Sequence, residues 1–364
     1  MKKQVLEIST GILRYDGMSK VLISLIDNAP KDKVEVSVLL GKGAIPEFYE
    51  ELKKRHVRYF EGPDRELDVK HYIPYLRKLL KSHHFDVVHV HGNSATMALD
   101  LFIAETCGVK TRIAHSHNTI SKHPRVHAVM KPFLNMVTNQ PAACGQDAGK
   151  FLFNKKFTLV PNCIDVEKFR FNPEVRAEER KKLGIGDEFL IGNVGRFTYQ
   201  KNHQFLIKIF NAVLKKEPTA KLLLIGDGEL LDDIKKQVSA LGISKSVIFY
   251  GTSDHVNRLM QAMDCFLLPS KYEGLSVTAL EAQAAGLPCI MTDTISKETE
   301  KSHLCEFLPE GDALDKWADT IVQKHREKDD RAVGSEEIIK SGYDIKNLPR
   351  IVEKIWGGGK EPPS

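Results

Sequence analysis

The sequence predicts an α/β protein of two domains, each built around a doubly wound parallel sheet. Short apolar runs typical of buried strands alternate with stretches whose apolar residues recur at helical spacing. This alternation continues through both halves of the chain, and repeated strand–helix units favour parallel sheets. A chain of 364 residues is also long enough to form two hydrophobic cores.

The expected strands and the domain boundary follow from the apolar runs and from one polar stretch. Strands are expected near residues 3–8, 34–40, 57–60, 86–90, 110–116, 142–144 and 157–160, and in the second half near 189–194, 221–225, 247–250, 265–268 and 289–292. The stretch RFNPEVRAEERKKLG, which begins at Arg170, is polar enough to separate two cores. We therefore expect domains at 1–172 and 173–344.

Composition excludes several classes of protein. The six cysteines form no C-x-x-C pair and lie mostly in apolar strands, which indicates reduced thiols and not a disulfide or zinc framework. Polar residues interrupt the first strand, so the N-terminus does not resemble a signal peptide. No run approaches the roughly 18 apolar residues that span a bilayer. We expect a cytoplasmic protein, either soluble or peripheral at the inner face of the cell membrane.

Two carboxylates flank an expected strand–helix junction in PSKYEGLSVTALEAQAAGLP. Glu273 lies in the turn after the strand, and Glu281 lies in the second turn of a helix expected over 276–285. Gly286 and Pro288 are typical of the end of such a helix. In α/β proteins, ligands bind at the carboxyl ends of the strands, and the first helical turn offers N–H groups to an anion. One carboxylate could therefore bind sugar hydroxyls and the other a ribose. Solvated side chains near a helix start are the alternative.

Two cations lie in the corresponding turn of an earlier strand–helix unit. Arg196 and Lys201 follow the strand at 189–194 and precede a helix for which Asn202 is the expected cap. Together they could neutralise a diphosphate, Arg196 by its planar fork and Lys201 as a point charge. Cations are unfavourable at a helix N-terminus, so ordinary surface positions explain them less well.

These residues resemble the donor-site signature of the retaining nucleotide-sugar glycosyltransferases of family 4. There, Glu-Gly-(Phe or Leu)-Gly precedes a second Glu by a fixed interval. Glu273, Gly274, Leu275 and Glu281 match this pattern, and Ser276 stands where the second Gly is common. The resemblance implies that Glu273 contacts the transferred sugar and that Glu281 contacts the ribose.

The family's phosphate-binding stretch, Gly-Arg-x-x-x-x-Lys, is matched by Gly195, Arg196 and Lys201. The motif matches span most of the chain. They imply the GT-B architecture, in which two Rossmann-like domains face a central cleft and the C-terminal helix crosses back to the N-terminal domain. Residues 345–356 are the candidate for that helix, and the tail at 357–364 is expected to be disordered.

The N-terminal domain is expected to bind the acceptor. The family often has Gly-Gly-x-Glu after its first strand, where backbone N–H groups point toward the donor phosphate or the acceptor. Gly17 matches one glycine of this motif, whereas Asp16 replaces the other and Ser19 replaces the Glu. The resemblance therefore implies a donor-binding role for Gly17.

Two pairs of histidines end expected strands, His89 and His91 in HVHG and His115 and His117 in AHSHN. Because side chains alternate along a strand, the members of each pair share a face, and a metal site is conceivable. Structural, hydrogen-bonded histidines are the alternative, which we favour for His89 and His91. His117 precedes Asn118 where the family has a histidine near the reacting sugar. The resemblance thus gives His117 a role in positioning donor and acceptor, with His115 as the second choice.

Two acid-free basic segments lie in the first half of the chain, a helix-like stretch at 70–84 and an expected loop at 121–134. A basic amphipathic surface suits peripheral contact with an anionic membrane, and a solvated outer helix is the alternative. Because no nucleic-acid-binding motif accompanies these segments and the net charge is only +5, no nucleic-acid partner is expected.

The sequence and the resemblance together predict a retaining glycosyltransferase. It would transfer a hexose-type sugar from a nucleotide diphosphate, most simply UDP, to a glycan acceptor that is lipid-linked, in bacterial surface or exopolysaccharide biosynthesis. His117 and Glu273 are the expected catalytic residues. No cofactor and no metal are expected, because no convincing D-x-D motif is present and cations are available instead. The alternatives are a sugar-nucleotide epimerase of the same architecture and a non-catalytic accessory subunit of a glycosyltransferase complex.

Overall fold

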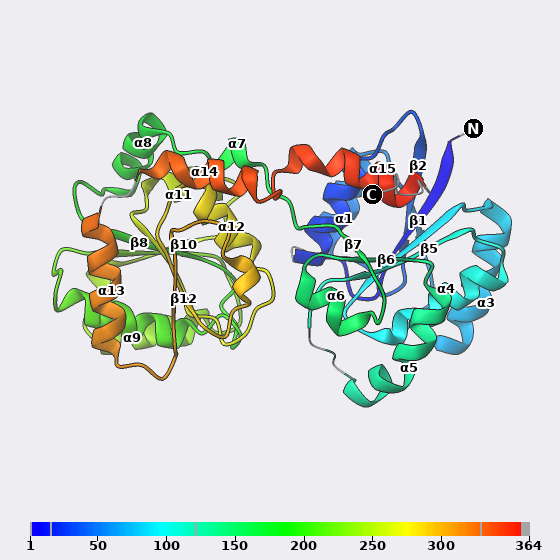
Figure 1. The fold of residues 1–364 in the computed structure, drawn as a ribbon. Helices are drawn as coiled ribbons and strands as arrows, with labels where there is room; N and C mark the ends of the chain where they lie inside the picture. Colours follow the sequence, from blue (N-terminus) through cyan, green and yellow to red (C-terminus); the bar gives the residue numbers. More distant parts are fainter. Residues whose placement is uncertain (1, 15–16, 120, 122, 328–329, 358–364) are drawn as a thin grey trace. The chain divides into compact units, whose positions relative to one another are not determined.

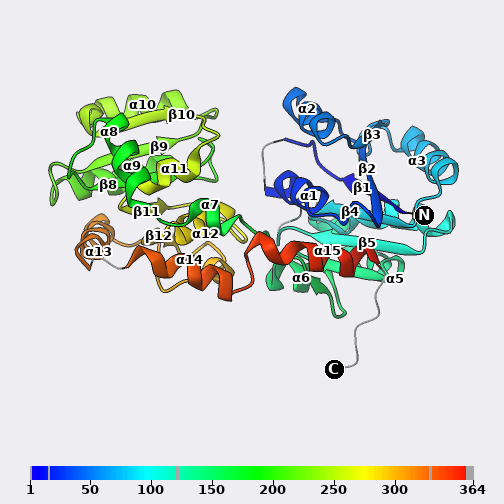
Figure 2. The same ribbon diagram turned by 90° about the horizontal axis from the view of Figure 1, so that it is seen from above.

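The chain folds into two compact units, which we describe separately (Figure 1). The structure is a computed structural model that describes residues 2–14, 17–119, 121, 123–327 and 330–357. Unit 1 comprises Met1–Cys163 and Lys346–Ser364, and unit 2 comprises Ile164–Ile345. In each unit, helices cover both faces of a central sheet, as expected for a doubly wound α/β fold (Figure 2).

The sheet of unit 1 is parallel in the described residues and has the order β3-β2-β1-β4-β5-β6-β7. Its strands are β1 (Lys3–Ser9), β2 (Val34–Leu40), β3 (Arg58–Glu61), β4 (Val87–Gly92), β5 (Thr111–Ser116), β6 (Gln140–Ala143) and β7 (Thr158–Leu159). Strand order reverses between β1 and β4, because β2 and β3 lie on one side of β1 and β4 to β7 lie on the other. Such a reversal opens a crevice at the carboxyl ends of the two strands.

The helices of unit 1 pack on both faces of this sheet. They are α1 (Gly17–Asp27), α2 (Pro46–Lys54), α3 (Val69–His83), α4 (Ala98–Thr106), α5 (Pro124–Val137), α6 (Gln146–Leu152) and α15 (Leu348–Gly357), with a 3₁₀ turn η1 (Ala95–Met97). Apolar residues of α3, α4 and α5 share one core with Leu6 and Ile8 of β1. Those of α1 and α2 form a second core with Val38 and Leu40 of β2.

The sheet of unit 2 repeats this arrangement, with the order β10-β9-β8-β11-β12-β13 in the described residues. Its strands are β8 (Leu190–Val194), β9 (Lys221–Ile225), β10 (Val247–Gly251), β11 (Cys265–Leu268), β12 (Cys289–Thr292) and β13 (Cys305–Leu308). Here the order reverses between β8 and β11. The sequence did not predict β13, because this short edge strand CEFL carries Glu306 between its apolar residues.

Two helical layers cover the sheet of unit 2. Its helices are α7 (Val166–Phe169), α8 (Pro173–Leu183), α9 (His203–Leu214), α10 (Leu231–Ala240), α11 (Val256–Ala262), α12 (Val277–Ala284), α13 (Leu314–Glu327) and α14 (Arg331–Lys340), with 3₁₀ turns η2 (Ser244–Ser246), η3 (Lys297–Thr299) and η4 (Ile345–Asn347). Helices α9, α10 and α13 share one core, and α7, α11, α12 and α14 share the other.

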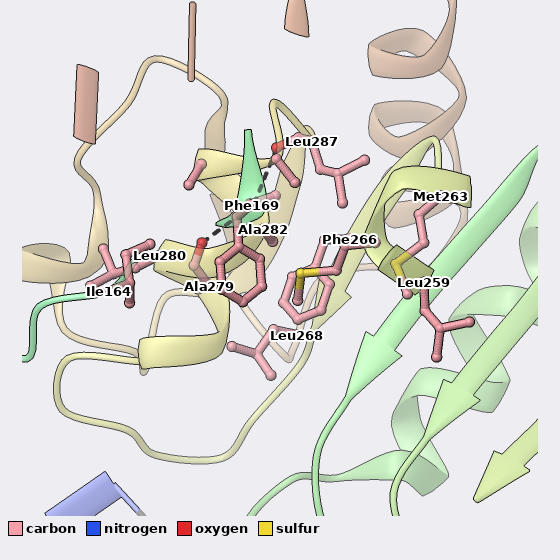
Figure 3. Packing of buried hydrophobic residues seen from close by; sticks show 14 of the residues in the cluster. Ile164, Phe169, Leu259, Met263, Phe266, Leu268, Ala279, Leu280, Ala282 and Leu287 are labelled. Carbon is pink, nitrogen blue, oxygen red and sulfur yellow. Dashed lines mark hydrogen bonds between the residues drawn. The ribbon is translucent and has the colours of Figure 1, made fainter. Parts of the chain in front are cut away.

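The core around α12 holds the strand–helix junction that the sequence singles out (Figure 3). Ala279, Leu280 and Ala282 of α12 pack against Phe266 and Leu268 of β11. All five side chains are fully buried. Small alanines on the helix allow it to lie close to the sheet, and this packing fixes the helical end of the loop between β11 and α12.

The boundary between the units lies between residues 163 and 164 and not after residue 172. The polar stretch that suggested a linker forms α8, whose charges serve packing. Arg176 and Arg180 both bind Asp264, and Arg180 also donates to the carbonyl oxygens of Gly186 and Glu188. The charged side chains of α8 hydrogen-bond buried backbone groups, so this helix has the polar composition of a linker.

The C-terminal helix α15 belongs to unit 1. Trp356 is fully buried, and its indole N–H donates to Nδ1 of His89 at 3.2 Å. Lys3 of β1 donates to the carbonyl oxygen of Trp356. The helix therefore joins the end of the chain to its first strand. Of the tail expected at 357–364, Gly357 ends α15, and residues 358–364 lie outside the described part.

Replacing Trp356 should destabilise unit 1 alone. We expect Trp356→Ala to lower the opening free energy of unit 1 by about 3–5 kcal/mol, because it leaves a large cavity beside β1 and β4. Hydrogen exchange measured by mass spectrometry should show faster exchange in peptides from β1 and β4 and no change in peptides from β8 and β9. Trp317→Ala, which removes a buried indole from unit 2, is the matched control with the opposite pattern. Equal losses in both units for either variant would contradict the division.

Candidate functional site

The two loops that leave the switch point of unit 2 are hydrogen-bonded to each other. The first follows β8 and contains Gln200, and the second follows β11 and contains Lys271 and Tyr272. Lys271 N–H donates to the Gln200 carbonyl oxygen at 2.8 Å, and Gln200 Nε2 donates to the Tyr272 carbonyl oxygen at 3.0 Å. The candidate donor-binding residues in these loops are therefore held side by side.

Lys201 and Glu273 form an ion pair across these loops. Lys201 Nζ lies 2.5 Å from Glu273 Oε1, and the side chains are 18% and 8% exposed. Ser270 Oγ donates to the same carboxylate oxygen at 2.7 Å. Burial raises the pKa of Glu273, but Lys201 and the hydroxyl hydrogen bonds outweigh it, so that the pKa lies below its ordinary value. Glu273 is therefore an ionised, largely buried acceptor.

Arg196 is the more available cation of the pair that the sequence singles out. Its side chain is 57% exposed, and its guanidinium lies 3.8 Å from the exposed carboxylate of Glu229. A pair at this distance between two exposed groups contributes little to stability. The structure thus places Lys201 against Glu273 and leaves the Arg196 guanidinium mostly in solvent.

Close backbone packing shapes the turn after β8. A Cβ atom on Gly226 would lie 2.1 Å from the Gly195 carbonyl oxygen, and one on Gly228 would lie 2.6 Å from the Phe197 carbonyl oxygen. Both glycines also have positive φ, 142° and 156°. The sequence Gly226-Asp227-Gly228 is therefore needed for the close approach of two turns, which its pattern alone did not establish.

The start of α12 is fixed by a neighbouring turn. Ser276 precedes the helix, is 3% exposed, and its N–H donates to Thr299 Oγ1 at 3.2 Å. The Thr299 hydroxyl in turn donates to the Gly274 carbonyl oxygen at 3.4 Å. Leu275 packs against the adjacent core, and Glu281 is half-buried in the second turn of α12. The expected helix at 276–285 corresponds to α12.

The expected capping role of Asn202 is wrong. Asn202 does precede α9, but its backbone is left-handed with φ of 55°, and its side chain makes no capping hydrogen bond. Its amide donates instead to Glu310 Oε1 at 3.1 Å. The next residue, His203, stacks on Phe197 with ring centroids 4.1 Å apart.

In unit 1, Gly17 is the first residue of α1, and a Cβ atom there would meet no other atom within 4 Å. The described surroundings therefore do not require glycine at this position. Asp16, the other departure from the motif, lies outside the described residues. Ser19, which stands where the family has Glu, is buried, and its Oγ accepts the Arg14 N–H at 3.2 Å.

The four histidines gather around one buried carboxylate. Glu7 of β1 contacts His89 Nδ1 at 3.0 Å and also binds His91 Nε2. His89 Nε2 lies 3.2 Å from His115 Nδ1, and His91 Nδ1 lies 2.9 Å from His117 Nε2. Glu7, His89, His91 and His115 are fully buried. His89 and His91 are thus hydrogen-bonded histidines, as the favoured interpretation expects, and His117 is hydrogen-bonded to His91.

Glu7 is the main residue that the sequence interpretation missed. In the sequence, Glu7 is only one of the polar residues that interrupt the first strand. A carboxylate in the middle of VLEIS, flanked by residues that face a core, is a signal of a buried polar partner. The register pairs Glu7 with His89 across β1 and β4, which the sequence did not reveal.

Each of these two polar clusters lies at the switch point of its own sheet, and comparison with known proteins identifies the class of the protein as a glycosyltransferase. Residues 15–168 match the family model "Glycosyltransferase Family 4", and residues 175–321 match "Glycosyl transferases group 1". EpsF of Bacillus subtilis (strain 168), named as a glycosyltransferase, is 32% identical over 363 residues, covering 95% of this chain and 94% of EpsF. The chain belongs to glycosyltransferase family 4.

Other relatives extend this assignment. The UDP-Gal:α-D-GlcNAc-diphosphoundecaprenol α-1,3-galactosyltransferase of Escherichia coli is 27% identical over 268 residues, covering 68% of each chain. Among solved structures, Alr3699/HepE of Anabaena, in complex with UDP, aligns over 99% of this chain and 100% of its own, with a TM-score of 0.82 and 16% identity. WaaG, a glycosyltransferase of lipopolysaccharide biosynthesis, aligns with a TM-score of 0.73 and 15% identity, over 98% of this chain and 99% of its own. These structures confirm the GT-B fold.

The stability of unit 2 should depend on His203 below neutral pH. Burial and the nearby Lys201 lower the pKa of His203 to about 4, and neither ring nitrogen has a hydrogen-bond partner in the described residues. The unfolded chain takes up the proton near pH 6.5, so stability falls as the pH drops from 6.5 toward 4. Between pH 7 and pH 5, His203 should contribute a loss of about 2 kcal/mol.

Urea unfolding followed by tryptophan fluorescence tests this contribution. In a Trp356→Phe background, Trp317 is the remaining tryptophan of the chain and lies in the core of unit 2. Adding His203→Phe should flatten the pH dependence by the stated amount. His255→Gln, at an exposed histidine of the same unit, should leave it unchanged. An equal slope with and without His203 would show that other groups cause the loss.

Proposed function

We propose that the protein is a retaining, metal-independent hexosyltransferase that uses a UDP-sugar donor. The observation that carries this proposal is the buried Lys201–Glu273 ion pair beside the exposed Arg196 at the switch point of unit 2. A ligand that draws Lys201 toward a phosphate must also supply donors to Glu273, because an unpaired buried carboxylate is costly. A nucleotide sugar meets both needs, with its diphosphate for the cations and its sugar hydroxyls for Glu273.

The named residues take the following roles in the proposal. Arg196 and Lys201 neutralise the diphosphate leaving group, so no divalent cation is needed. Glu273 orients the sugar through its hydroxyls, and Glu281 binds the ribose. Gly17, Gly195, Gly274, Leu275 and Ser276 complete the donor site, with backbone groups close to the donor.

We infer same-face transfer. The acceptor hydroxyl would attack the anomeric carbon from the side that the diphosphate leaves, and the leaving phosphate would take its proton. Glu273, occupied with Lys201 and Ser270, is suited to accept hydrogen bonds from the sugar and not to form a bond to the anomeric carbon. His117 would position the sugar as the second catalytic residue. Donor and product then share anomeric configuration.

Relatives support the choice of donor and acceptor. HepE was solved in complexes with UDP and with UDP-glucose, and the Escherichia coli relative carries UDP-Gal and a diphosphoundecaprenol-linked acceptor in its name. We propose by this analogy that the acceptor is a lipid-linked glycan of bacterial surface or exopolysaccharide synthesis, elongated at the inner face of the cell membrane.

The experiment that tests the function is a panel of nucleotide sugars with release of UDP or GDP as the readout. The purified protein is incubated with each donor and a lipid-diphosphate saccharide, with and without excess EDTA. Transfer from a UDP-sugar that survives EDTA and keeps the anomeric configuration, read by NMR, is expected. An inverted product would refute the retaining step, and activity restored only by Mg²⁺ or Mn²⁺ would refute metal independence. Epimerised donor without transfer would identify an epimerase, and no turnover with any donor would support an accessory subunit.

Removing Arg196 should impair turnover without affecting folding. We expect Arg196→Ala to lower kcat/KM by about 10²-fold or more, because it removes one preorganised stabiliser of the leaving group. Lys208→Ala, at an exposed lysine of α9 in the same unit, is the matched control and should retain normal kinetics. Near-normal kcat/KM in Arg196→Ala would remove Arg196 from the donor site.

We propose that the surface of α3 contacts an anionic membrane. Lys70, Arg77, Lys78 and Lys81 are exposed, and an open groove of about 560 Å³ runs beside Ile73 and Pro74. The second basic segment differs from the expectation, because it forms α5 and the Lys131 amine donates to the Phe151 carbonyl oxygen at 2.7 Å. Lys122 lies outside the described residues. Within the described part of the chain, no helix has the length and apolar character to span a bilayer.

Salt-dependent binding to vesicles tests the α3 surface. The protein should sediment with anionic liposomes at low salt and be released as the salt concentration rises, because each cation near an anionic surface contributes about 1 kcal/mol. Changing Arg77, Lys78 and Lys81 together to Gln should abolish this binding. The same three changes at Lys235, Lys236 and Lys245 of unit 2 are the control. Equal binding to neutral and anionic liposomes would indicate a merely solvated face.

A further inference from the structure

Glu7, His91 and His117 form a continuous hydrogen-bonded chain across three neighbouring strands. Glu7 lies on β1, His91 on β4, and His117 directly follows β5. The register pairs Glu7 with His89 and His91 with His115, so these side chains lie on the same face of the sheet. His91 Nε2 binds the Glu7 carboxylate, and His91 Nδ1 lies 2.9 Å from His117 Nε2. Each ring nitrogen of His91 therefore faces a specific partner.

In the hydrogen bond between Glu7 and His91, the donor can be identified. Burial raises the pKa of Glu7, but His89 and His91 outweigh it and lower the pKa to about 2. The carboxylate is therefore ionised and accepts hydrogen bonds only. It follows that His91 Nε2 carries a hydrogen and donates it to Glu7.

The second link follows from the first. With Nε2–H donated to Glu7, a His91 ring that carries a single hydrogen offers Nδ1 as an acceptor. The partner nitrogen, His117 Nε2, must then carry a hydrogen. Burial and the neighbouring imidazoles of His91 and His89 lower the pKa of His117 well below its ordinary value, so His117 is neutral. Its other nitrogen, Nδ1, is left with a lone pair.

His117 Nδ1 is the open end of the chain. This atom is buried, and no hydrogen-bond partner lies near it in the described residues. An unsatisfied buried acceptor is costly unless a ligand or water supplies a donor. A sugar hydroxyl is such a donor.

We propose that Glu7 and His91 are positioning residues that hold His117 as its Nε2–H tautomer, with Nδ1 presented as a hydrogen-bond acceptor to a sugar hydroxyl of the substrate. This inference rests on the proposed function, which places a sugar beside His117. It assigns a role to two residues that do not themselves touch substrate. A carboxylate that fixes the tautomer of a functional imidazole is a well-established device, and its removal leaves the wrong nitrogen protonated.

The same carboxylate also supports a side branch that provides a control. Glu7 contacts His89, His89 contacts His115, and the Trp356 indole nitrogen lies 3.2 Å from His89 Nδ1. Trp356→Phe removes the indole N–H beside His89 and leaves the contacts from Glu7 through His91 to His117 in place. A general disturbance of the buried cluster would therefore affect both variants, whereas loss of the positioning chain affects Glu7→Gln alone.

Nitrogen NMR of the full-length protein labelled with [¹⁵N]histidine reads the tautomer directly. Long-range ¹H–¹⁵N correlation should show His117 with hydrogen on Nε2 and bare Nδ1, its signals identified by their loss in His117→Gln. Trp356→Phe should retain this pattern, and Glu7→Gln should shift it toward the Nδ1–H form. An Nδ1–H tautomer in the unchanged protein would overturn the proposal, even if Glu7→Gln does not fold. So would an unchanged tautomer in folded Glu7→Gln, or a metal ion bound in place of these protons.

Kinetics then test the consequence. Glu7→Gln should lower kcat at least about tenfold, with a smaller change in KM, because a misplaced proton impairs a positioned imidazole after the sugar has bound. Normal turnover in a Glu7→Gln protein with the altered tautomer would refute the positioning role. If the unchanged protein transfers no sugar from any donor, the proposed function fails while the measured tautomer still stands, so the two failures are distinguishable.

Discussion

The reversal of strand order in each sheet is the constraint on which the candidate sites depend. Parallel strands bring all their carboxyl ends to one edge, and a reversal sends the connections on either side of it in opposite directions. In unit 2 the reversal lies between β8 and β11, and the loops after these strands carry Lys201 and Glu273. In unit 1 it lies between β1 and β4, which carry Glu7 and His91. Residues far apart in sequence are thus neighbours because of topology.

Both candidate sites keep a largely buried carboxylate ionised in the same way. Each reversal contains a largely buried carboxylate whose pKa is lowered by cationic or hydrogen-bonding partners despite burial. Burial alone would favour the protonated form, so the partners are what keep Glu7 and Glu273 ionised. Each carboxylate is therefore a strong acceptor that orders the groups around it. Removing one partner would leave a buried charge unpaired, which costs more stability than removing both members of the pair.

Much of the fold, and less of the site, was predictable from the sequence. Apolar runs identified twelve strands because buried parallel strands have a local signature. The edge strand β13 and the helix α8 were missed, since Glu306 and the arginines of α8 have surface-like composition. The loops that hold Arg196 and Glu273 were placed correctly. That Lys201 pairs with Glu273, and Glu7 with His91, depends on strand order and register, which no local pattern contains.

The two clusters lie on different kinds of secondary structure, one on strands and the other on loops, and this difference has a functional consequence. Glu7 and His91 lie within strands, whose backbone positions are fixed by ladders on both sides, so the orientation of His117 is set by the sheet itself. Arg196 lies in a loop with most of its side chain in solvent. Under the proposed function, His117 must be placed accurately, and it is therefore held by side chains of rigid strands. The Arg196 side chain, which would contact an incoming and a departing diphosphate, is instead largely surrounded by solvent.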